Sequence, residues 1–494
     1  MTPINIDFVA LNIPSLLPIF ITLFAALLLM VLDLIKPIGK LANTLISMSA
    51  TIASLYVVMN VSVGQKGYFD LLTIDSITVL SQIIILLAST IFIPLSLTSK
   101  RFHEFELPEF YSLFLFVVSG FQIMVSTTNF ALIFLGLETS SLALYTLISM
   151  HNRDRSVEGA IKYFTMGSLA AGFLAFGIAL FYLATGSLDI AVGLANLESG
   201  STHLNYGILL AGLAFILAAF AFKLSIVPFH TWTPDVYEGA SAPLAGYMSI
   251  VPKMAGFVVM IRLFETLVQM DVVWVRDMLI ICAVATMTIG NILALVQESV
   301  KRMLAFSSIS HAGFVLVAIL VATTESNSAL FLYWTIFTFA NLGAFSMLWV
   351  SRHKNKIFHN RFDHPFSKFS GMVYLSPIGA ICMAVFMLSL AGVPPFGLFW
   401  GKFFLISSVV SEGYVFLALV MLLNSAIAVY YYVKLIVYMF LRDPSQNDST
   451  LYYNNITPVF KFIIAAAATI SVFAMAGVDW ILKFIYGYLQ LSGF

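Results

Sequence analysis

The chain has 494 residues, of which 60% are hydrophobic and only 10% are Asp, Glu, Lys or Arg, and its formal net charge at pH 7 is zero. A soluble protein carries about 25% charged residues, so this composition excludes a soluble enzyme, a nucleic-acid binder and a disordered chain. The apolar runs are about twenty residues long and do not alternate with polar residues as barrel strands do. We therefore predict an all-α polytopic membrane protein surrounded by lipid.

Apolar segments that are long enough to cross a bilayer follow one another along the whole chain, since a span takes about twenty residues. Residues 1–494 are predicted to form a single transmembrane domain with about fourteen transmembrane helices. In chain order the predicted spans are 14–33, 41–61, 74–97, 108–127, 129–150, 158–184, 206–229, 243–264, 273–296, 303–322, 328–350, 372–392 continuing as 397–410, 414–440 and 458–478. The tail, 479–494, is interpreted as a short interfacial helix.

Lys and Arg residues are distributed unequally between the predicted loops. Fifteen lie on one side of the membrane and four lie on the other. Because cytoplasmic loops carry the excess of Lys and Arg, the fifteen are predicted to be cytoplasmic and both termini to lie outside, in the periplasm. The remaining basic residues fall inside predicted spans: Lys162, Lys223, Lys253, Lys402 and Lys434.

Charged residues inside the spans are the first candidates for a function. A lysine near the bilayer centre costs about 2.5–3.5 kcal/mol, so several of them indicate a role. Glu138, in the span 129–150, is the acid nearest to a span centre. Desolvation disfavours an ammonium and a nearby carboxylate favours it, so a lysine near Glu138 would bind protons with adjustable affinity. Alternatively, Lys162 and Lys434 can extend to the interface, and Glu138 can be an inert protonated residue.

Proline interrupts two of the predicted spans. The segment Lys223–His230 contains Pro228, with Pro234 close behind, and the segment Ala391–Gly397 contains Pro394. Proline lacks a backbone donor, and unwound backbone inside a membrane is tolerated where it is buried in protein or lines a wet cavity, as at the ion sites of transporters. We predict that helices 7 and 12 are broken. A simple proline kink is the alternative at each position.

The two interruptions are related to each other. Pro228 and Pro394 are 166 residues apart, each has a lysine within eight residues, and their spans cross the predicted membrane in opposite directions. Such a relation is expected of an inverted repeat. We predict two inverted five-helix repeats: spans 4–8, in residues 108–265, and spans 9–13, in residues 272–440.

Two histidines are candidate proton relays. His230 follows the first interruption, and His311 lies in the predicted span 303–322. A neutral histidine can pass a proton between its ring nitrogens near neutral pH, although each can equally be a satisfied core or loop residue.

Cys282 and Cys382 lie in apolar runs, and the sequence has no CxxC, P-loop, GxGxxG or HExxH motif. We predict no metal-binding and no cofactor-binding residue in this chain.

Three long motifs carry a resemblance to a known family. They are FKLSIVPFHTWTPDVYEGA at 222–240, KRMLAFSSISHAG at 301–313 and LAGVPPFGLFWGK at 390–402. Together they resemble the antiporter-like membrane subunits of respiratory complex I, the bacterial proton-pumping NADH:quinone oxidoreductase. The VYEG ending of the first motif is similar to the subunit N group of this family, not to the L and M groups. The resemblance covers nearly the whole chain.

The resemblance implies roles for individual residues. The family's key glutamate falls on Glu138, the lysine of its broken span 7 on Lys223, its connecting lysine on Lys253 and its terminal lysine on Lys402. Further family positions fall on Lys162, His230 and His311, which are candidate relays. No family role falls on Lys434.

The resemblance also implies a reaction and its partners. The chain would translocate protons across the bacterial inner (plasma) membrane, driven by quinone reduction elsewhere in an NADH:quinone oxidoreductase, and would hold no redox centre itself. NAD, FMN, iron–sulfur clusters and quinone would be in partner subunits, and the neighbours would be the antiporter-like M subunit and small membrane subunits. The alternatives are a subunit of a multisubunit Na+/H+ antiporter, a membrane subunit of a related complex with a different electron donor, and a scaffold that transports nothing.

Overall fold

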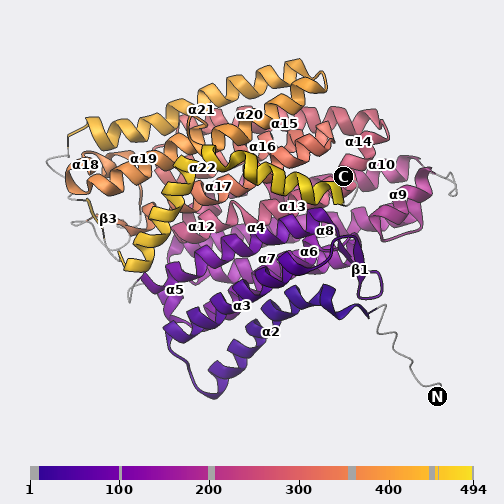
Figure 1. The fold of residues 1–494 in the computed structure, drawn as a ribbon, viewed down its shortest axis with the longest axis horizontal. Coiled ribbons are helices and arrows are strands. Elements are labelled where there is room, and N and C mark those ends of the chain that lie inside the picture. The colour runs from indigo at the N-terminus through magenta and orange to yellow at the C-terminus, as the bar shows by residue number, and fades with distance from the viewer. Residues whose placement is uncertain are drawn as a thin grey trace.

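The fold is known from a computed structural model, which describes residues 11–98, 103–198, 206–353, 363–443, 451–453 and 456–491. Nearly all of these residues lie in helices that pack side by side, with α2 and α3 at one edge of the molecule and α21 at the opposite edge (Figure 1). The prediction of an all-α polytopic membrane protein is confirmed. Of the fifteen basic residues predicted to be cytoplasmic, five lie outside the described residues: Lys100, Arg101, Lys354, Lys356 and Arg361.

The first half of the chain contains the helices α2 to α14. Their bounds are α2 (Ile13–Ile35), α3 (Lys40–Asn60), α4 (Ser76–Phe92), the 3-10 helix η1 (Ile93–Thr98), α5 (His103–Glu106), α6 (Glu109–Val125), α7 (Phe130–Ser149), α8 (Asp154–Thr185), α9 (Ile190–Glu198), α10 (Tyr206–Leu224), α11 (Trp232–Gly239), α12 (Ala242–Met248), α13 (Val251–Met260), the π-helix η2 (Ile261–Glu265) and α14 (Thr266–Gln269). The hairpin of β1 (Gln65–Gly67) and β2 (Leu72–Ile74) precedes α4.

The second half contains α15 to α22. Their bounds are α15 (Val273–Leu295), α16 (Val300–Val321), α17 (Thr324–Val350), the 3-10 helix η4 (Phe366–Phe369), α18 (Met372–Leu375), α19 (Pro377–Ala391), α20 (Gly397–Ser411), α21 (Val415–Leu441) and α22 (Pro458–Leu491). The antiparallel strands β3 (Ser351–His353) and β4 (Leu451–Tyr453) bring the ends of α17 and α22 together.

Twelve helices of the described part are long and apolar enough to cross a membrane. Three shorter apolar helices, α6, α19 and α20, accompany them. Most predicted spans coincide with these helices to within about five residues, although the predicted span 243–264 is divided among α12, α13 and η2. The number of fourteen transmembrane helices stays a prediction. It is reached only if α6, with its seventeen residues, is counted as one further span and α19 together with α20 as another.

The C-terminal helix differs from its prediction. We predicted a span that ends at 478 and a separate interfacial tail at 479–494, but α22 continues unbroken over 34 residues to Leu491. Two apolar side chains of the continuation, Ile485 and Leu489, are buried in the protein. At about 1.5 Å per residue it is about 51 Å long, more than a bilayer's thickness of hydrocarbon. In Figure 1 it bends and runs across its neighbours, and it packs on α17.

Both predicted interruptions are breaks, not kinks. Between α10 and α11 the chain makes turns over 225–231, and Ser225 takes a positive φ of 62°. Between α19 and α20 the helix ends at Gly392, which has a φ of 78°, in the left-handed region that favours glycine. Proline then prevents each helix from continuing directly.

The division into two repeats remains a prediction. The described helices agree with it in one respect: the break falls in the fourth span of each predicted repeat, at α10–α11 in 108–265 and at α19–α20 in 272–440. This position is what an inverted repeat with broken helices requires.

Candidate functional site

Three of the predicted lysines are buried inside the helix bundle. The exposed fractions of Lys223, Lys253 and Lys402 are 3%, 1% and 4%. Each lies beside an irregularity of its helix: Lys223 in the last turn of α10, Lys253 in the first turn of α13, and Lys402 in the second turn of α20. The helix ends that the breaks create therefore hold the amines in the protein interior.

The Lys223 ammonium is bound by hydroxyl groups. Its Nζ donates to Ser141 Oγ of α7 at 2.8 Å and to Tyr163 OH of α8 at 3.2 Å. It also lies 5.6 Å from the centroid of the Phe121 ring. Aromatic faces and hydroxyl oxygens stabilise a cation, but neither group neutralises it.

Glu138 does not contact Lys223 directly. Among the described residues, the hydrogen-bond partners of Lys223 are Ser141 and Tyr163, and no ion pair within 4.0 Å joins it to the carboxylate. Glu138 is half-buried on α7, three residues before Ser141. Residues three apart share a helix face, so the carboxylate lies one turn from the serine that binds the lysine.

Lys253 is held by one residue of α16. Its Nζ donates to the backbone oxygen of Ser308 at 2.6 Å and to the Ser308 hydroxyl at 3.1 Å. Both acceptors are neutral. The ammonium is thus satisfied in part, in a region where its neighbours on α13 are fully buried apolar residues.

Lys402 binds the end of the broken helix. Its Nζ donates to the carbonyl oxygens of Leu390 at 3.3 Å and Ala391 at 2.9 Å, and to Ser425 Oγ at 3.2 Å. The last carbonyls of α19 have no partner within their own helix and carry the negative end of its dipole, so they attract a cation. The Phe314 ring of α16 lies 5.3 Å from the same Nζ.

His311 lies between the last two lysines. The buried imidazole on α16 is hydrogen-bonded through Nδ1 to the hydroxyl of Tyr333 and through Nε2 to Tyr432 OH, the latter at 3.0 Å. Tyr432 OH is also hydrogen-bonded to the Ser307 hydroxyl. The result is a connected group of hydroxyls around one imidazole, in which each partner can both donate and accept.

One face of α16 connects these contacts. Ser308 binds Lys253, His311 binds the two tyrosines, and Phe314 lies against Lys402. The three residues are spaced at intervals of three, which places them along one side of a helix. Ser308, His311 and Phe314 therefore form a strip along one side of α16, here called the α16 strip, that contacts Lys253 near one end and Lys402 near the other.

The remaining predicted residues lie elsewhere. His230 is half-buried in the turns between α10 and α11, and its Nδ1 has no hydrogen-bond partner within the described chain. Lys434 on α21 lies 4.4 Å from the centroid of the Phe366 ring and donates to the Gln297 carbonyl at 3.4 Å. The structure does not bring either residue into contact with the three buried lysines.

Lys162 is not a buried amine, contrary to its place in the predicted span 158–184. Its side chain is 42% exposed and forms ion pairs with Glu158 at 2.7 Å and Asp235 at 3.0 Å. The reason is that α8 begins at Asp154, so Lys162 lies only about two turns from the N-terminal end of the helix. Arg302 joins the same cluster, 2.8 Å from Asp235. Burial raises the pKa of Asp235, but hydrogen bonds from Arg302 and Lys162 outweigh this and hold it below its usual value.

Most hydroxyl partners of the lysines and of His311 could not be picked out from the sequence. Ser141, Tyr163, Tyr333, Tyr432 and Ser425 lie in apolar runs and become partners only through helix packing. Their only signal was polarity inside a predicted span.

In the described part of the chain no cluster of three or more His, Cys, Asp or Glu side chains could hold a metal ion.

Comparisons with known proteins agree with one another. Residues 127–428 match the family described as "NADH:quinone oxidoreductase/Mrp antiporter, TM". Proteins named NADH-quinone oxidoreductase subunit N are 54% identical in Sulfurimonas denitrificans, over the whole of both chains, and 49% identical in Campylobacter concisus, over 99% of each.

Solved structures show the same fold. A chain of respiratory complex I from Thermus thermophilus is 26% identical with a TM-score of 0.80, and the match covers 94% of this chain and 98% of that one. A chain of the Mrp complex from Dietzia is 19% identical with a TM-score of 0.82, covering 97% and 98%. The second likeness concerns the fold alone.

Proposed function

The chain belongs to the NADH:quinone oxidoreductase/Mrp antiporter membrane family, in its NADH-quinone oxidoreductase subunit N group, and from this premise we propose that it translocates protons through Lys223, Lys253 and Lys402. The observation that carries the proposal is the set of partners of these buried amines. All their described hydrogen-bond acceptors are hydroxyl or carbonyl oxygens. An amine with neutral partners can lose its proton without leaving a buried carboxylate unpaired.

The proposed path begins at Glu138 on α7 and continues through Ser141 to Lys223. It passes to Lys253 and then along the α16 face, where His311 and its tyrosines lie before Lys402. The contacts from Lys253 to Ser308 and from Lys402 to the end of α19 support the second part of this path. A change in the Glu138–Lys223 separation would alter the proton affinity of the lysine, because a carboxylate favours the ammonium.

The energy would come from another part of the complex. In this proposal quinone reduction occurs in partner subunits, which hold NAD, FMN, iron–sulfur clusters and quinone, and this chain contributes only the proton path. Its neighbours would be the antiporter-like M subunit and small membrane subunits, in the bacterial inner membrane with both termini outside. The likeness to subunit N over the full length of the chain supports its membership in such a complex.

The test is proton pumping by the complex that contains this chain, reconstituted in liposomes. We expect Glu138→Ala and Lys223→Ala to lower the number of protons moved per quinone reduced, with the complex still assembled. Lys434→Ala is the matched control, since Lys434 also lies in a span but contacts none of the proposed path. Normal stoichiometry in both path variants would contradict the site, and would also favour a scaffold.

A cation/proton antiporter subunit is the second candidate, because the Dietzia Mrp chain shares the fold. The two functions differ in partners and in energy source. Purification in mild detergent with flavin and iron–sulfur subunits would support the redox-driven pump. Sodium–proton exchange that needs no electron donor would support the antiporter.

A further inference from the structure

A polar cavity lies at one end of the span that carries Lys253. It has a volume of about 780 Å³ and is bordered by the π-helix η2, by α9 and α14, and by the N-terminal turn of α17. Both charged side chains with which this span lines the cavity, Arg262 and Glu265, belong to the π-helix. π-helical segments are rare and frequent at functional sites. By the predicted orientation, this end of the span faces the outside.

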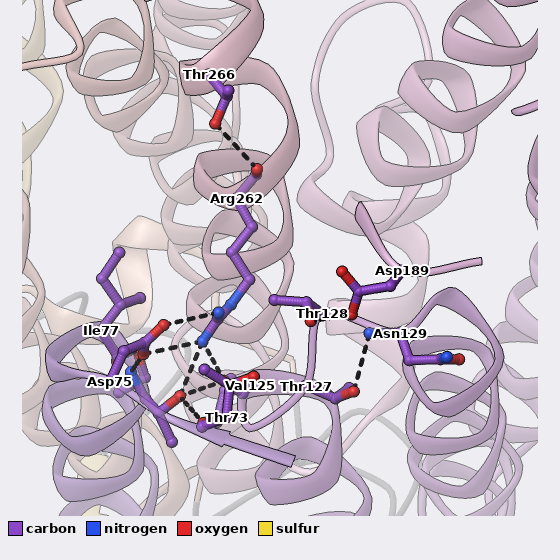
Figure 2. Close-up of polar contacts among 12 residues, drawn as sticks. Thr73, Asp75, Ile77, Val125, Thr127, Thr128, Asn129, Asp189, Arg262 and Thr266 are labelled. Atoms are coloured by element: carbon purple, nitrogen blue, oxygen red, sulfur yellow. Dashed lines mark hydrogen bonds and ion pairs between the residues drawn. The ribbon is translucent and has the colours of Figure 1, made fainter. Parts of the chain in front are cut away.

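Arg262 is paired with another acid, Asp75. Its guanidinium binds both carboxylate oxygens of Asp75, at 2.8 Å and 3.0 Å, and also donates to Thr78 Oγ1 and to the Val125 carbonyl. Figure 2 shows the side chain reaching across to Asp75 beside Val125. Arg262 and Asp75 therefore neutralise each other, and the arginine is not an ion-pair partner for Glu265.

Glu265 and Asn327 have unmet hydrogen-bonding capacity. Glu265 is 4% exposed and Asn327 1%, and Asn327 Nδ2 donates to Glu265 Oε1 at 2.8 Å. Glu265 Oε2 and Asn327 Oδ1 are both buried and have no donor within the described residues. An ionised carboxylate here would lack a counter-charge, which is costly in a protein interior.

One proton supplies what both oxygens lack. If Glu265 is a neutral acid, its Oε2–H can donate to Asn327 Oδ1, while Asn327 Nδ2 continues to donate to Oε1. Of the other charged side chains that line the described cavity wall, Asp75 and Arg262 pair with each other, and Glu325 on α17 is exposed. The cavity wall thus carries more acids than bases, and it attracts cations. Among cations, a proton needs no ligand beyond the carboxyl oxygen that it binds.

We propose that Glu265 is a proton-binding carboxyl group that exchanges its proton with water in this cavity, at the outer end of the span that carries Lys253. On exchange the O–H bond of the acid breaks and an O–H bond of a cavity water forms. The two residues are twelve positions apart along the span, about 18 Å at 1.5 Å per residue. Only one part of this proposal rests on the proposed function, namely that translocated protons leave the protein at this site.

The test is infrared difference spectroscopy of the whole complex, reconstituted in membranes, between two values of pH and in H2O against D2O. We expect a protonated-carboxyl band that shifts in D2O and is lost in Glu265→Gln. Glu325→Gln, which removes an exposed carboxyl from the same cavity wall, should keep the band. Asn327→Ala keeps the acid and removes its partner, so it should shift the band, and it serves if Glu265→Gln does not assemble.

Two results would overturn the proposal. The first is an unchanged band in both Glu265→Gln and Asn327→Ala, which would mean that Glu265 is ionised. The second is loss of the band when sodium is added at constant pH, which would mean that the oxygens bind a metal cation. The same band should persist in Lys223→Ala, so that failure of the proposed pumping path and failure of this site give different results.

Discussion

At the scale of single residues, the proposed proton path depends on amines that are buried without a counter-charge in contact. Sequence reasoning identified Lys223, Lys253 and Lys402, because a lysine within a long apolar run is conspicuous. It could not identify how they are held, since Ser308 and the carbonyls of α19 approach them only in the folded bundle. For Lys162 the sequence left open both a buried amine and a side chain that extends to the interface, and in the structure the side chain is partly exposed and ion-paired.

Lys223→Arg should abolish proton transfer through α10 without removing the positive charge. A guanidinium does not release its proton at accessible pH, so charge is kept and exchange is lost. We expect quinone reduction to continue with fewer protons pumped per electron pair in proteoliposomes. Lys434→Arg should leave the stoichiometry unchanged. Equal pumping by wild type and Lys223→Arg would exclude deprotonation of this amine.

Gly392→Ala should disturb Lys402 directly. Gly392 has a φ of 78°, and a Cβ there would come within 2.8 Å of Lys402 Cδ and 3.1 Å of its Nζ. The left-handed conformation costs a residue with a Cβ about 1–2 kcal/mol, and the contact adds a displacement of the amine. Gly413 is a matched control with a φ of 81° and no atom within 4 Å. We expect both alanine variants to lower the unfolding temperature, but only Gly392→Ala to reduce pumping; equal pumping losses would contradict this.

Tyr432→Phe should interrupt the network of hydrogen-bonded hydroxyls around His311. The substitution removes the hydrogen bonds to His311 Nε2 and Ser307, and buried polar groups left without partners cost about 1–3 kcal/mol. We expect slower pumping and a modest loss of stability. Tyr438→Phe, on the same helix α21, is the control, since it removes a hydroxyl with no described hydrogen bond. Unchanged pumping rates in Tyr432→Phe would remove this tyrosine from the path.

At the scale of elements, most helices follow from the sequence because most long apolar runs bounded by polar residues form one helix, while the run 243–264 forms α12, α13 and η2. The breaks in helices 7 and 12 followed from proline. The continuation of α22 beyond 478 did not, because Asp479 and Trp480 are typical of a membrane boundary while the helix there is fixed by packing. The π-helix η2 was also beyond prediction, since nothing in the residues of Ile261–Glu265 distinguishes it from an α-helix.

The ion pairs of Asp235 should help to hold α11 in place over a wide pH range. Its pKa is lowered in the folded protein, so its contribution to stability is present above the unfolded value of about 3.9 and is lost as the pH falls below that value. We expect Asp235→Asn to increase hydrogen exchange of the α11 amides equally at pH 7 and pH 5. The effect is small because the side chain is 37% exposed. A difference that disappears already at pH 5 would contradict a lowered pKa. Glu158→Gln serves as a control for the exposed pair within α8.

At the scale of the whole molecule, three buried amines lie within one helical bundle, and the α16 strip links two of them. The polytopic fold and its family were predictable because composition and three long motifs extend over the chain. The inverted repeats, the orientation and the number of spans remain predictions. The path is a property of the assembled bundle, since the hydrogen-bond partners of each lysine lie on helices other than its own.

Proton pumping with Lys253→Met tests the central claim most directly. Lys253 is 1% exposed, and methionine is an unbranched side chain of similar length that fills irregular space without a charge, so the bundle should tolerate it. In proteoliposomes we expect the assembled complex to reduce quinone while moving fewer protons per electron pair than wild type, with Lys434→Met at the wild-type value. A wild-type proton stoichiometry in Lys253→Met would contradict the proposal that buried lysines carry the protons.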